Sequence, residues 1–277
     1  MLPSSGCAIL RKIMDVELHV IGLQTDLHWR DPDANLAHFD TLLGRLDGGS
    51  IDLVVLPEMF TTGFSWPPVY PAGGSTAVLQ WMQAWADRIG AALIGSVACH
   101  DAEGRARNRC WFVPPTDEGA PVHYDKRHLF TLAGEHDHFT AGDDRVEVEF
   151  RGFRILLQVC YDLRFPVFVR NNRSPAYDLA VYVANWPQAR TAAWRTLLQA
   201  RAIENQCFVV GINRSGTDGK GHAYSGDSLI ADFAGALLAD AGGDGQPKHL
   251  TAALSHRDLM AFRQKLPFLE DADGRQA

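Results

Sequence analysis

Runs of consecutive apolar residues alternate along this chain with segments in which apolar residues recur every three or four positions. Bounded apolar runs are typical of buried strands, and the longer spacing is typical of amphipathic helices. In the first half, strands are expected at "VELHVIGLQ", "IDLVVLP", "AALIGSVAC" and "RCWFVPP". Helices are expected over about 76–89 and from Pro32, with one apolar face formed by Leu36, Phe39, Leu42, Leu43 and Leu46.

The second half repeats this alternation. Strands are expected at "VEVEF", "FRILLQVC", "DLAVYVANW" and "CFVVGIN", with a short helix after Cys160 and a long one over about 191–205. Continuous apolar strands need cover on both faces, whereas each helix has one apolar stripe, so the sheet belongs inside and the helices outside. The pattern predicts a layered α/β protein.

The expected elements form one domain. No Pro/Gly/Ser-rich linker, repeat or shift in composition interrupts them before about Ala241, and we expect a single domain over 14–271. The strand pattern starts near Met14, so residues 1–13 are expected to be a flexible N-terminal extension. The tail from Asp258 is polar and is assigned to no helix or strand.

The composition favours a globular protein with a small partner. The chain has 277 residues, 46% of them hydrophobic, which is enough for one sizeable core. The formal net charge is −7, and Lys and Arg are spread along the chain. This argues against binding to nucleic acid or to an anionic membrane.

The cysteines and the N-terminus bear on the compartment. The five cysteines are widely spaced and include no C-x-x-C pair, which argues against disulfides and a zinc site. No apolar run approaches the ~18 residues of a membrane helix, and "MLPSSGCAIL" is too short and polar for a secretory core. We therefore expect reduced thiols and a cytoplasmic protein.

Cys160 stands where an apolar strand ends and a helix with Pro166 in its first turn begins. A sulfur at that junction would lie near backbone N–H groups with partial positive charge, which lower a thiol pKa and bind an oxyanion. A buried core cysteine is the alternative, and the flanking "YDLRFP" weakens it. Cys160 is therefore a candidate nucleophile.

Two charged residues are placed to assist such a thiol. Glu58 follows the strand "IDLVVLP" directly, and Lys126 lies in a loop, "VHYDKRHLF", flanked by apolar residues. Open α/β sheets gather functional side chains at the carboxyl ends of their strands. Taken alone, Glu58 could also cap a helix and Lys126 could be solvated.

The blocks around these residues, "LPEMF", "YDKRHLF" and "VCYDLRFP", resemble those of the nitrilase, or carbon–nitrogen hydrolase, superfamily. The resemblance runs in order from about Met14 to Asp271. It implies a four-layer α-β-β-α sandwich and a catalytic triad of Glu58, Lys126 and Cys160. "TLAGEHDHFTAG" adds Glu135, which resembles the second glutamate that many members hold beside the triad lysine.

The resemblance also implies a mechanism. Glu58 would take the thiol proton, and Cys160 would attack an amide carbonyl to give ammonia and a thioester that water hydrolyses. The Lys126 ammonium and the backbone N–H of Tyr161 would bind the oxyanion. Glu135 would orient Lys126 or the substrate. The mechanism implies no metal and no organic cofactor.

Further residues are candidates for the substrate pocket. Asn185 and Trp186 follow the strand "DLAVYVA", which places them at the same rim unless they only form a structural turn. Arg164 and Arg190 are candidates for a substrate carboxylate, although an arginine early in a helix, such as Arg164, more often makes a structural ion pair. Three aromatic residues could either line the pocket or pack a loop: Phe60, Phe64 and Trp66. Of these, Phe64 is included among the substrate-binding candidates.

Within the superfamily, "LPEMFTTGF", "DKRHLF" and "NWP" look most like the omega-amidases, which hydrolyse the distal amide of 2-oxoglutaramate or 2-oxosuccinamate. Aliphatic amidase, carbamoylase and deaminated-glutathione amidase activities stay open. A nitrilase is less attractive, because nitrilases typically have a tryptophan–glutamate pair where this chain has Tyr161 and Asp162. The family also commonly forms dimers and larger assemblies, so a homo-oligomer is expected, with "TLLQARAIENQ" as an interface candidate.

Three hypotheses belong to other classes. A metal hydrolase is suggested by a crowd of histidines, but no H-E-x-x-H is present and we expect no metal site; the histidines are His123, His128, His136 and His138. A Cys–His hydrolase would use a histidine as the base in place of Glu58. A non-catalytic binding protein would be expected to have a broken triad.

Overall fold

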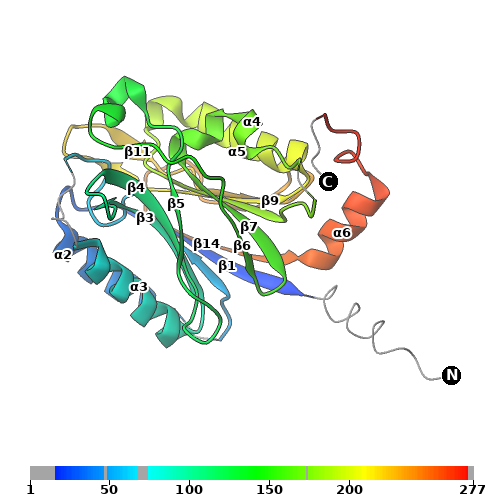
Figure 1. Cartoon of the computed structure of the whole chain (residues 1–277), viewed down its shortest axis with the longest axis horizontal. Helices are drawn as coiled ribbons and strands as arrows, with labels where there is room; N and C mark the ends of the chain where they lie inside the picture. Colours follow the sequence, from blue (N-terminus) through cyan, green and yellow to red (C-terminus); the bar gives the residue numbers. More distant parts are fainter. Residues whose placement is uncertain (1–15, 47–48, 68–73, 173, 274–277) are drawn as a thin grey trace.

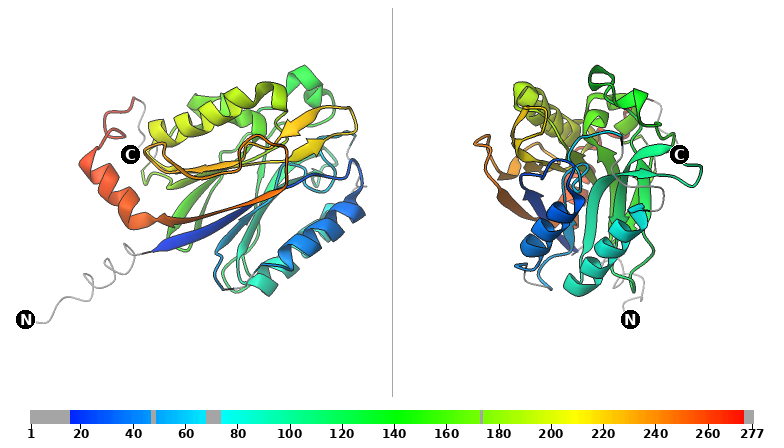
Figure 2. Two further views of the ribbon diagram at one scale, coloured as in Figure 1. Left: turned by 180° about the vertical axis from the view of Figure 1, so that it is seen from behind. Right: turned by 90° about the vertical axis from the view of Figure 1, so that its left-hand side faces the viewer.

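The computed structural model describes residues 16–46, 49–67, 74–172 and 174–273. Two six-stranded sheets lie face to face, and helices cover their outer faces (Figure 1). Figure 2 shows these layers from behind and from one side. The four-layer sandwich implied by the resemblance is therefore confirmed, whereas the extension expected over 1–13 lies outside the described residues.

The first sheet has the strand order β14-β1-β2-β3-β4-β5. β1, β2 and β3 run parallel, and the other pairs are antiparallel. Its strands are β1 (Glu17–Gln24), β2 (Leu53–Val55), β3 (Ala92–His100), β4 (Ala106–Val113), β5 (Val122–Asp125) and β14 (Lys248–Ser255). Two helices cover its outer face, α2 (Pro32–Leu43) and α3 (Gly74–Ile89).

The second sheet has the order β13-β12-β9-β8-β7-β6, with β7, β8 and β9 parallel. Its strands are β6 (Glu147–Phe150), β7 (Phe153–Val159), β8 (Leu179–Ala184), β9 (Phe208–Asn213), β12 (Leu229–Ala231) and β13 (Leu237–Asp240). α5 (Thr191–Asn205) covers it at close range, because a Cβ on Gly211 of β9 would come within 2.4 Å of Leu198 of α5. A separate hairpin consists of β10 (Ser215–Thr217) and β11 (Ala223–Ser225).

The two-residue period of the strands divides the core into two parts. On β1, Leu18 and Val20 belong to the apolar cluster between the sheets. Ile21 and Leu23 belong to the cluster that α2 and α3 cover. The sheets approach so closely that a Cβ on Gly22 would lie 2.0 Å from Ile212 of β9.

The structure corrects two sequence predictions. The first four residues of the segment expected to be a loop form β5, so Lys126 lies at the start of the loop that follows this strand. The first residues of the polar tail, 258–265, form most of helix α6 (His256–Lys265), which buries Leu259. Polar composition hid this helix, because a short surface helix needs only one or two buried apolar residues.

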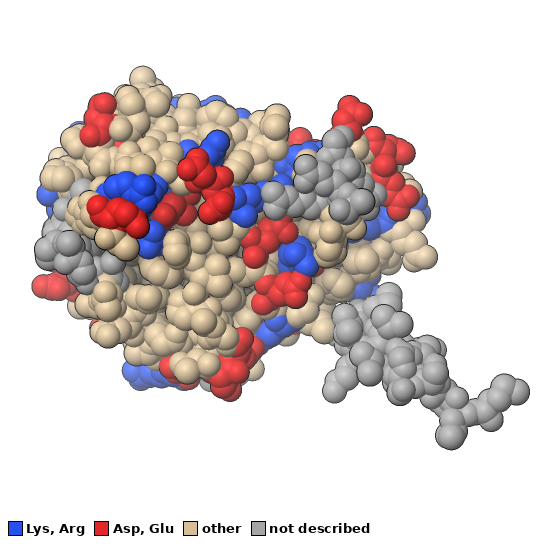
Figure 3. All heavy atoms as spheres, in the orientation of Figure 1, with Lys and Arg blue, Asp and Glu red and all other residues tan. Residues whose placement is uncertain are grey.

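Charged side chains of both signs are intermixed on the face drawn in Figure 3. Within the described ranges, no helix is long and apolar enough to cross a membrane.

Candidate active site

Cys160 opens a sharp turn at the end of β7. Its φ of +47° lies in the left-handed region that residues other than glycine rarely adopt. The 3-10 turn η3 (Cys160–Arg164) follows, and Asp162 accepts a hydrogen bond from the Val159 N–H at 3.0 Å. A separate helix, α4 (Pro166–Val169), then begins, so the short helix expected after Cys160 is divided into two turns.

The pKa of the Cys160 thiol is raised well above its ordinary value. Burial is the largest cause and the charge of Glu58 the next, while the Lys126 ammonium acts in the opposite direction. The lowered pKa expected at a helix N-terminus is therefore wrong, because burial and the nearby carboxylate outweigh the small dipole of a five-residue 3-10 turn. The thiol keeps its proton until a base removes it.

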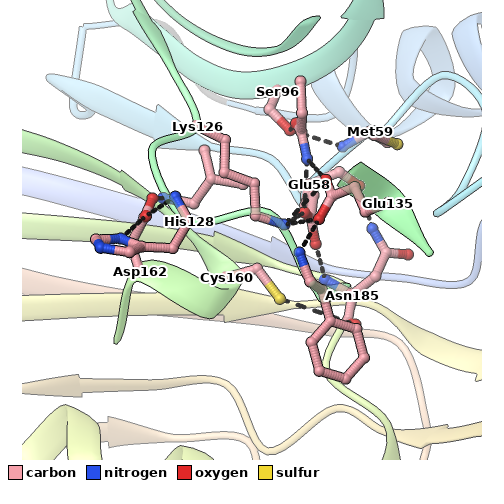
Figure 4. Close-up of polar contacts among 12 residues, drawn as sticks. Glu58, Met59, Ser96, Lys126, His128, Glu135, Cys160, Asp162 and Asn185 are labelled. Atoms are coloured by element: carbon pink, nitrogen blue, oxygen red, sulfur yellow. Dashed lines mark hydrogen bonds and ion pairs between the residues drawn. The ribbon is translucent and has the colours of Figure 1, made fainter. Parts of the chain in front are cut away.

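Lys126 lies between two carboxylates (Figure 4). Its Nζ is 2.8 Å from Oε1 of Glu58, and 2.9 and 3.2 Å from Oε2 and Oε1 of Glu135. All three side chains are completely buried. Burial lowers the pKa of Lys126, but the charges of Glu135 and Glu58 together outweigh it and raise that pKa, so the ammonium is retained.

Glu135 has further donors of its own. Its Oε2 accepts from the Phe130 N–H at 2.6 Å, and its Oε1 accepts from the Asn108 side chain at 3.0 Å. Burial raises the pKa of Glu135, and the Lys126 ammonium opposes that rise. The structure thus places Glu135 beside Lys126, at the position that the resemblance implied.

Two residues that the sequence analysis did not single out support these charged side chains, one directly and one through the other. Asn108 of β4 donates to Glu58 Oε1 at 2.8 Å as well as to Glu135. Ser96 of β3 donates to Asn108 Oδ1 at 2.9 Å and accepts from the Met59 N–H at 2.9 Å. Ser96 could have been found as a polar residue within the apolar strand β3, since a buried polar group needs a partner, whereas Asn108 stands between two arginines in β4 and has no such signal. We call Glu58, Lys126, Glu135 and Asn108 the buried cluster.

Asn185 connects the end of β8 to Glu58. Its backbone N–H donates to Glu58 Oε2 at 2.8 Å, and its side-chain amide donates to the Glu58 carbonyl at 2.5 Å. The Asn185 carbonyl lies 4.0 Å from Cys160 Sγ. Asn185 therefore holds the base and the thiol in one place.

A second buried carboxylate ties the Lys126 segment to the Cys160 turn. Asp162 accepts from the Tyr124 hydroxyl at 2.8 Å and from the His128 N–H at 3.0 Å, and His128 Nδ1 lies 2.8 Å from it. Because Asp162 also caps η3, the strand end that carries Lys126 and the turn that carries Cys160 are fixed to each other.

Cys160 lies at the wall of a cavity of about 350 Å³. Among the residues predicted from the sequence, the cavity lining includes Phe64, Tyr161, Arg164, Asn185, Trp186, Arg190 and Trp66. Phe60 is instead completely buried against Phe39, with ring centroids 5.4 Å apart. Of the three aromatic residues, Phe60 therefore packs the core, and Phe64 and Trp66 line the cavity.

Three cationic side chains line the same cavity, and we call them the cationic rim: Arg164, Arg190 and Lys220. Each lies over an aromatic ring of the lining, Arg164 over Trp186 at 4.9 Å, Arg190 over Phe130 at 5.1 Å and Lys220 over Trp66 at 3.8 Å. In the described parts of the chain, no carboxylate lies within 4.0 Å of any of the three. The structural ion pair considered for Arg164 is therefore wrong, and Lys220 was missed.

Lys220 is presented by the hairpin between β10 and β11. Asp218 Oδ1 accepts from the backbone N–H groups of Lys220 and His222, each at 2.9 Å, and Asp218 Oδ2 accepts from the Tyr224 hydroxyl at 2.9 Å. Asp218 therefore fixes the turn, and the ammonium of Lys220 remains available to a ligand. No apolar or catalytic pattern marks this turn in the sequence.

The four histidines of the metal hypothesis do not converge. Their contacts are four different residues: Asp162 for His128, Trp66 for His138, Trp111 for His123 and Asp137 for His136. Among the residues that the structure describes, no group of three or more His, Cys, Asp or Glu side chains is arranged to hold a metal ion.

Comparison with known proteins agrees with this geometry. The carbon–nitrogen hydrolase family model matches residues 20–264. A protein of Yersinia enterocolitica named omega-amidase YafV is 51% identical over 251 residues, which cover 91% of this chain and 95% of that protein. The Escherichia coli (strain K12) protein of the same name is 48% identical over 257 residues, which cover 92% and 97%.

A solved structure extends the similarity to three dimensions. A CN-hydrolase superfamily protein from Xanthomonas campestris, described with an arsenic adduct in its active site, is 39% identical, with a TM-score of 0.86. The match covers 95% of this chain and 99% of that one.

Proposed function

The chain belongs to the carbon–nitrogen hydrolase family, and we propose that it is an omega-amidase that hydrolyses the terminal amide of 2-oxoglutaramate or 2-oxosuccinamate. The observation that carries the proposal is a cavity with a thiol at its wall and three cations without a carboxylate partner in the described chain. A substrate with an amide at one end and a carboxylate at the other suits both features. The names of the similar omega-amidases, and of a 2-oxoglutaramate amidase that is 29% identical, support this substrate class.

Cys160 is the nucleophile in this proposal. Its sulfur forms a bond to the amide carbon, the carbonyl π electrons move to oxygen, and the thiol proton passes to Glu58. The raised pKa of Cys160 favours the protonated thiol before the attack, so the proposal assigns removal of this proton to Glu58. Glu58, joined to Asn185 beside the sulfur, is the base.

The tetrahedral oxyanion is bound by the Lys126 ammonium and the Tyr161 backbone N–H. A preorganised donor of this kind is worth about 10²–10³ in kcat. Glu58 then returns the proton to the nitrogen, the C–N bond breaks and ammonia leaves. Water then attacks the thioester and gives a proton to Glu58. The C–S bond breaks, and Glu58 returns this proton to the sulfur, which releases the acid and restores the thiol.

The cationic rim binds the substrate carboxylate, with Arg190 and Lys220 as the principal contacts. Phe64, Trp66 and Trp186 form aromatic walls around the carbon chain. A charge-assisted contact to an unpaired cation is stronger than a neutral hydrogen bond, and this favours a 2-oxo acid amide over a neutral amide.

The test is ammonia release by the purified protein from 2-oxoglutaramate, with glutamine, a simple nitrile and an N-carbamoyl amino acid for comparison. We expect rapid release from 2-oxoglutaramate that is lost in Cys160→Ala. Release from another member of the panel alone would overturn the substrate. Undiminished activity of Cys160→Ala would overturn the nucleophile.

The compartment and the assembly are part of the proposal. Cys99, Cys110, Cys160 and Cys207 are free and buried, which suits the reducing cytoplasm.

Val167 on α4 is 87% exposed and Ile203 on α5 is 54% exposed, and we propose that this side of the second sheet joins copies of the chain. Sedimentation at several concentrations would give a dimer or larger species, and a monomer throughout would contradict it.

A further inference from the structure

Asn108 joins the two carboxylates of the buried cluster, yet it takes no part in the reaction steps proposed for Cys160 and Glu58. We propose that Asn108, oriented by Ser96, is a positioning residue that directs the thiol proton to Oε2 of Glu58 and frees Lys126 to bind the oxyanion. The inference rests on the proposed function, because it assigns a part in the chemistry of Cys160 and Glu58.

The donors around Glu58 distinguish its two oxygens. An ionised carboxylate has about four acceptor positions, two on each oxygen. Oε1 of Glu58 accepts from Lys126 Nζ and from Asn108 Nδ2, each at 2.8 Å. Among the residues that the structure describes, Oε2 accepts one hydrogen bond, from the Asn185 N–H. A proton can therefore be received at Oε2 without displacing a donor, whereas Oε1 is already occupied.

Glu135 differs from Glu58 in the number of its acceptor positions that are occupied by donors. Its Oε1 accepts from Lys126 and Asn108, and its Oε2 accepts from Lys126 and the Phe130 N–H. All four acceptor positions are filled, so a proton on Glu135 would have to displace a donor. Although burial raises the pKa of Glu135, this saturation leaves Glu58 as the carboxylate that can serve as the base.

Lys126 must release one contact to bind an oxyanion. Its three N–H groups are directed at three carboxylate oxygens, and the contact to Glu135 Oε1 is the longest at 3.2 Å. Asn108 donates to that same oxygen at 3.0 Å. When Lys126 turns this N–H toward the oxyanion, Glu135 Oε1 still has a donor, so the turn leaves no buried acceptor without a partner.

The orientation of the Asn108 amide is fixed by a chain of donors. The Met59 N–H donates to Ser96 Oγ, which leaves the Ser96 hydroxyl hydrogen for Asn108 Oδ1. The reversed amide would direct an oxygen at two carboxylates. Met59 follows Glu58 and has a φ of +42°, so Ser96 also holds the turn that carries the base (Figure 4).

The titratable groups that interact with Glu58 come from four places in the fold. They are Lys126 after β5, Glu135 in η2 (Glu135–Asp137), Cys160 at the start of η3 and Cys110 on β4. Substitution of Asn108 changes none of these charges. A change in the pH profile would therefore report the lost N–H contacts themselves.

The test is Asn108→Leu, which keeps the branched shape and the number of heavy atoms of the side chain and removes both N–H donors. We expect kcat on 2-oxoglutaramate to fall about 100-fold with KM changed less than about threefold, because the lost contacts act after binding. The acid limb of the kcat/KM profile should move to higher pH, because a donor that favours the ionised carboxylate over the protonated one is gone. Ser96→Ala should give the same changes at smaller size, about fivefold in kcat.

A matched control separates positioning from stability. Asn171 is also buried and donates its side-chain amide to two backbone carbonyls, but it lies outside the site. Asn171→Leu should destabilise the protein and leave the pH profile unchanged. If Asn108→Leu lowers kcat with an unchanged profile, as a general loss of structure would, the inference is overturned. Should Asn108→Leu fail to fold, Ser96→Ala decides the matter by the same two readouts.

Alkylation of Cys160 by iodoacetamide separates this inference from the proposed function. The pH dependence of the alkylation rate reports proton transfer between Cys160 and Glu58 without any turnover. If the wild type cleaves no 2-oxoglutaramate but Asn108→Leu moves the alkylation profile relative to Asn171→Leu, the substrate is wrong and the role of Asn108 stands. If turnover is rapid and neither profile moves in Asn108→Leu, the omega-amidase stands and Asn108 has no positioning role.

Discussion

The buried cluster and the cationic rim hold charges in opposite ways. In the buried cluster, each charged side chain is completely buried and contacts an opposite charge within 3 Å. In the cationic rim, three side chains lie over aromatic rings, with no carboxylate within 4.0 Å in the described chain. One region has its charges paired, and the other is arranged for a charge that a ligand brings.

Burial explains the difference. An unpaired charge far from water is severely destabilised, so the buried cluster has to be complete before any substrate arrives. An unpaired cation at the wall of an open cavity is solvated and remains free to pair. Substitutions in the buried cluster should therefore act mainly on kcat, and substitutions in the cationic rim mainly on KM.

Glu58→Gln is the strongest test of the first half of that contrast. The amide keeps the shape of the side chain and cannot accept the Cys160 proton, so kcat should fall by about 10³-fold or more, with little change in KM. Steady-state kinetics of ammonia release measures both constants. The Cys–His alternative predicts the reverse: retained turnover in Glu58→Gln and loss in a variant of His222, the histidine that lines the cavity.

Lys220→Ala and Arg190→Ala test the second half. Each should raise KM for 2-oxoglutaramate about tenfold and leave kcat within about threefold, because a carboxylate contact made equally before and during the reaction is lost. Lys265→Ala is the matched control, since it removes the same charge from an exposed position on α6, and it should change neither constant. A fall in kcat at constant KM would place Lys220 or Arg190 in the chemistry instead.

The fold and much of the site could be predicted from the sequence, because long apolar strands and three motif blocks carry strong signals. Glu58, Lys126 and Cys160 follow β2, β5 and β7, and the structure brings them together. The order of strands and helices depends on local patterns of apolar residues, so it could be predicted from the sequence.

Residues that act through contacts distant along the chain were missed. Ser96 is a single polar residue in the apolar strand β3, whereas Asn108 lies between Arg107 and Arg109 in β4. What they bind depends on how β3, β4 and β2 are aligned. Lys220 lies in a turn whose position over the cavity depends on the packing of a hairpin against Trp66. The raised pKa of Cys160 was also unexpected, because burial, and after it the charge of Glu58, outweighs the dipole that the local sequence indicates.

The effect of burial alone can be measured at Cys207, a thiol outside the buried cluster. Burial raises its pKa to about 12, against the nearby Arg263, whereas an unfolded thiol titrates near ~8.5. The folded state thus holds the proton more tightly, and this stabilisation is complete below pH ~8.5 and is lost as the pH rises toward 12. Between pH 7.5 and 9.5, urea unfolding under reducing conditions should show the wild type losing about 1 kcal/mol more than Cys207→Ala. Equal losses would mean that Cys207 is not protected in the folded state.

Salt gives the smallest effect and compares both regions in one protein. Ions reach the cationic rim but not the completely buried cluster, and the screening length shortens from about 10 Å at 0.1 M to about 3 Å at 1 M. Raising sodium chloride across this range should increase KM for 2-oxoglutaramate about two- to threefold, because the attraction between rim and carboxylate weakens. The kcat should stay constant, because no ion enters between Lys126 and its two carboxylates. A neutral amide should show no rise in KM, and a kcat that falls with salt for both substrates would mean that the buried cluster is open to solvent during turnover.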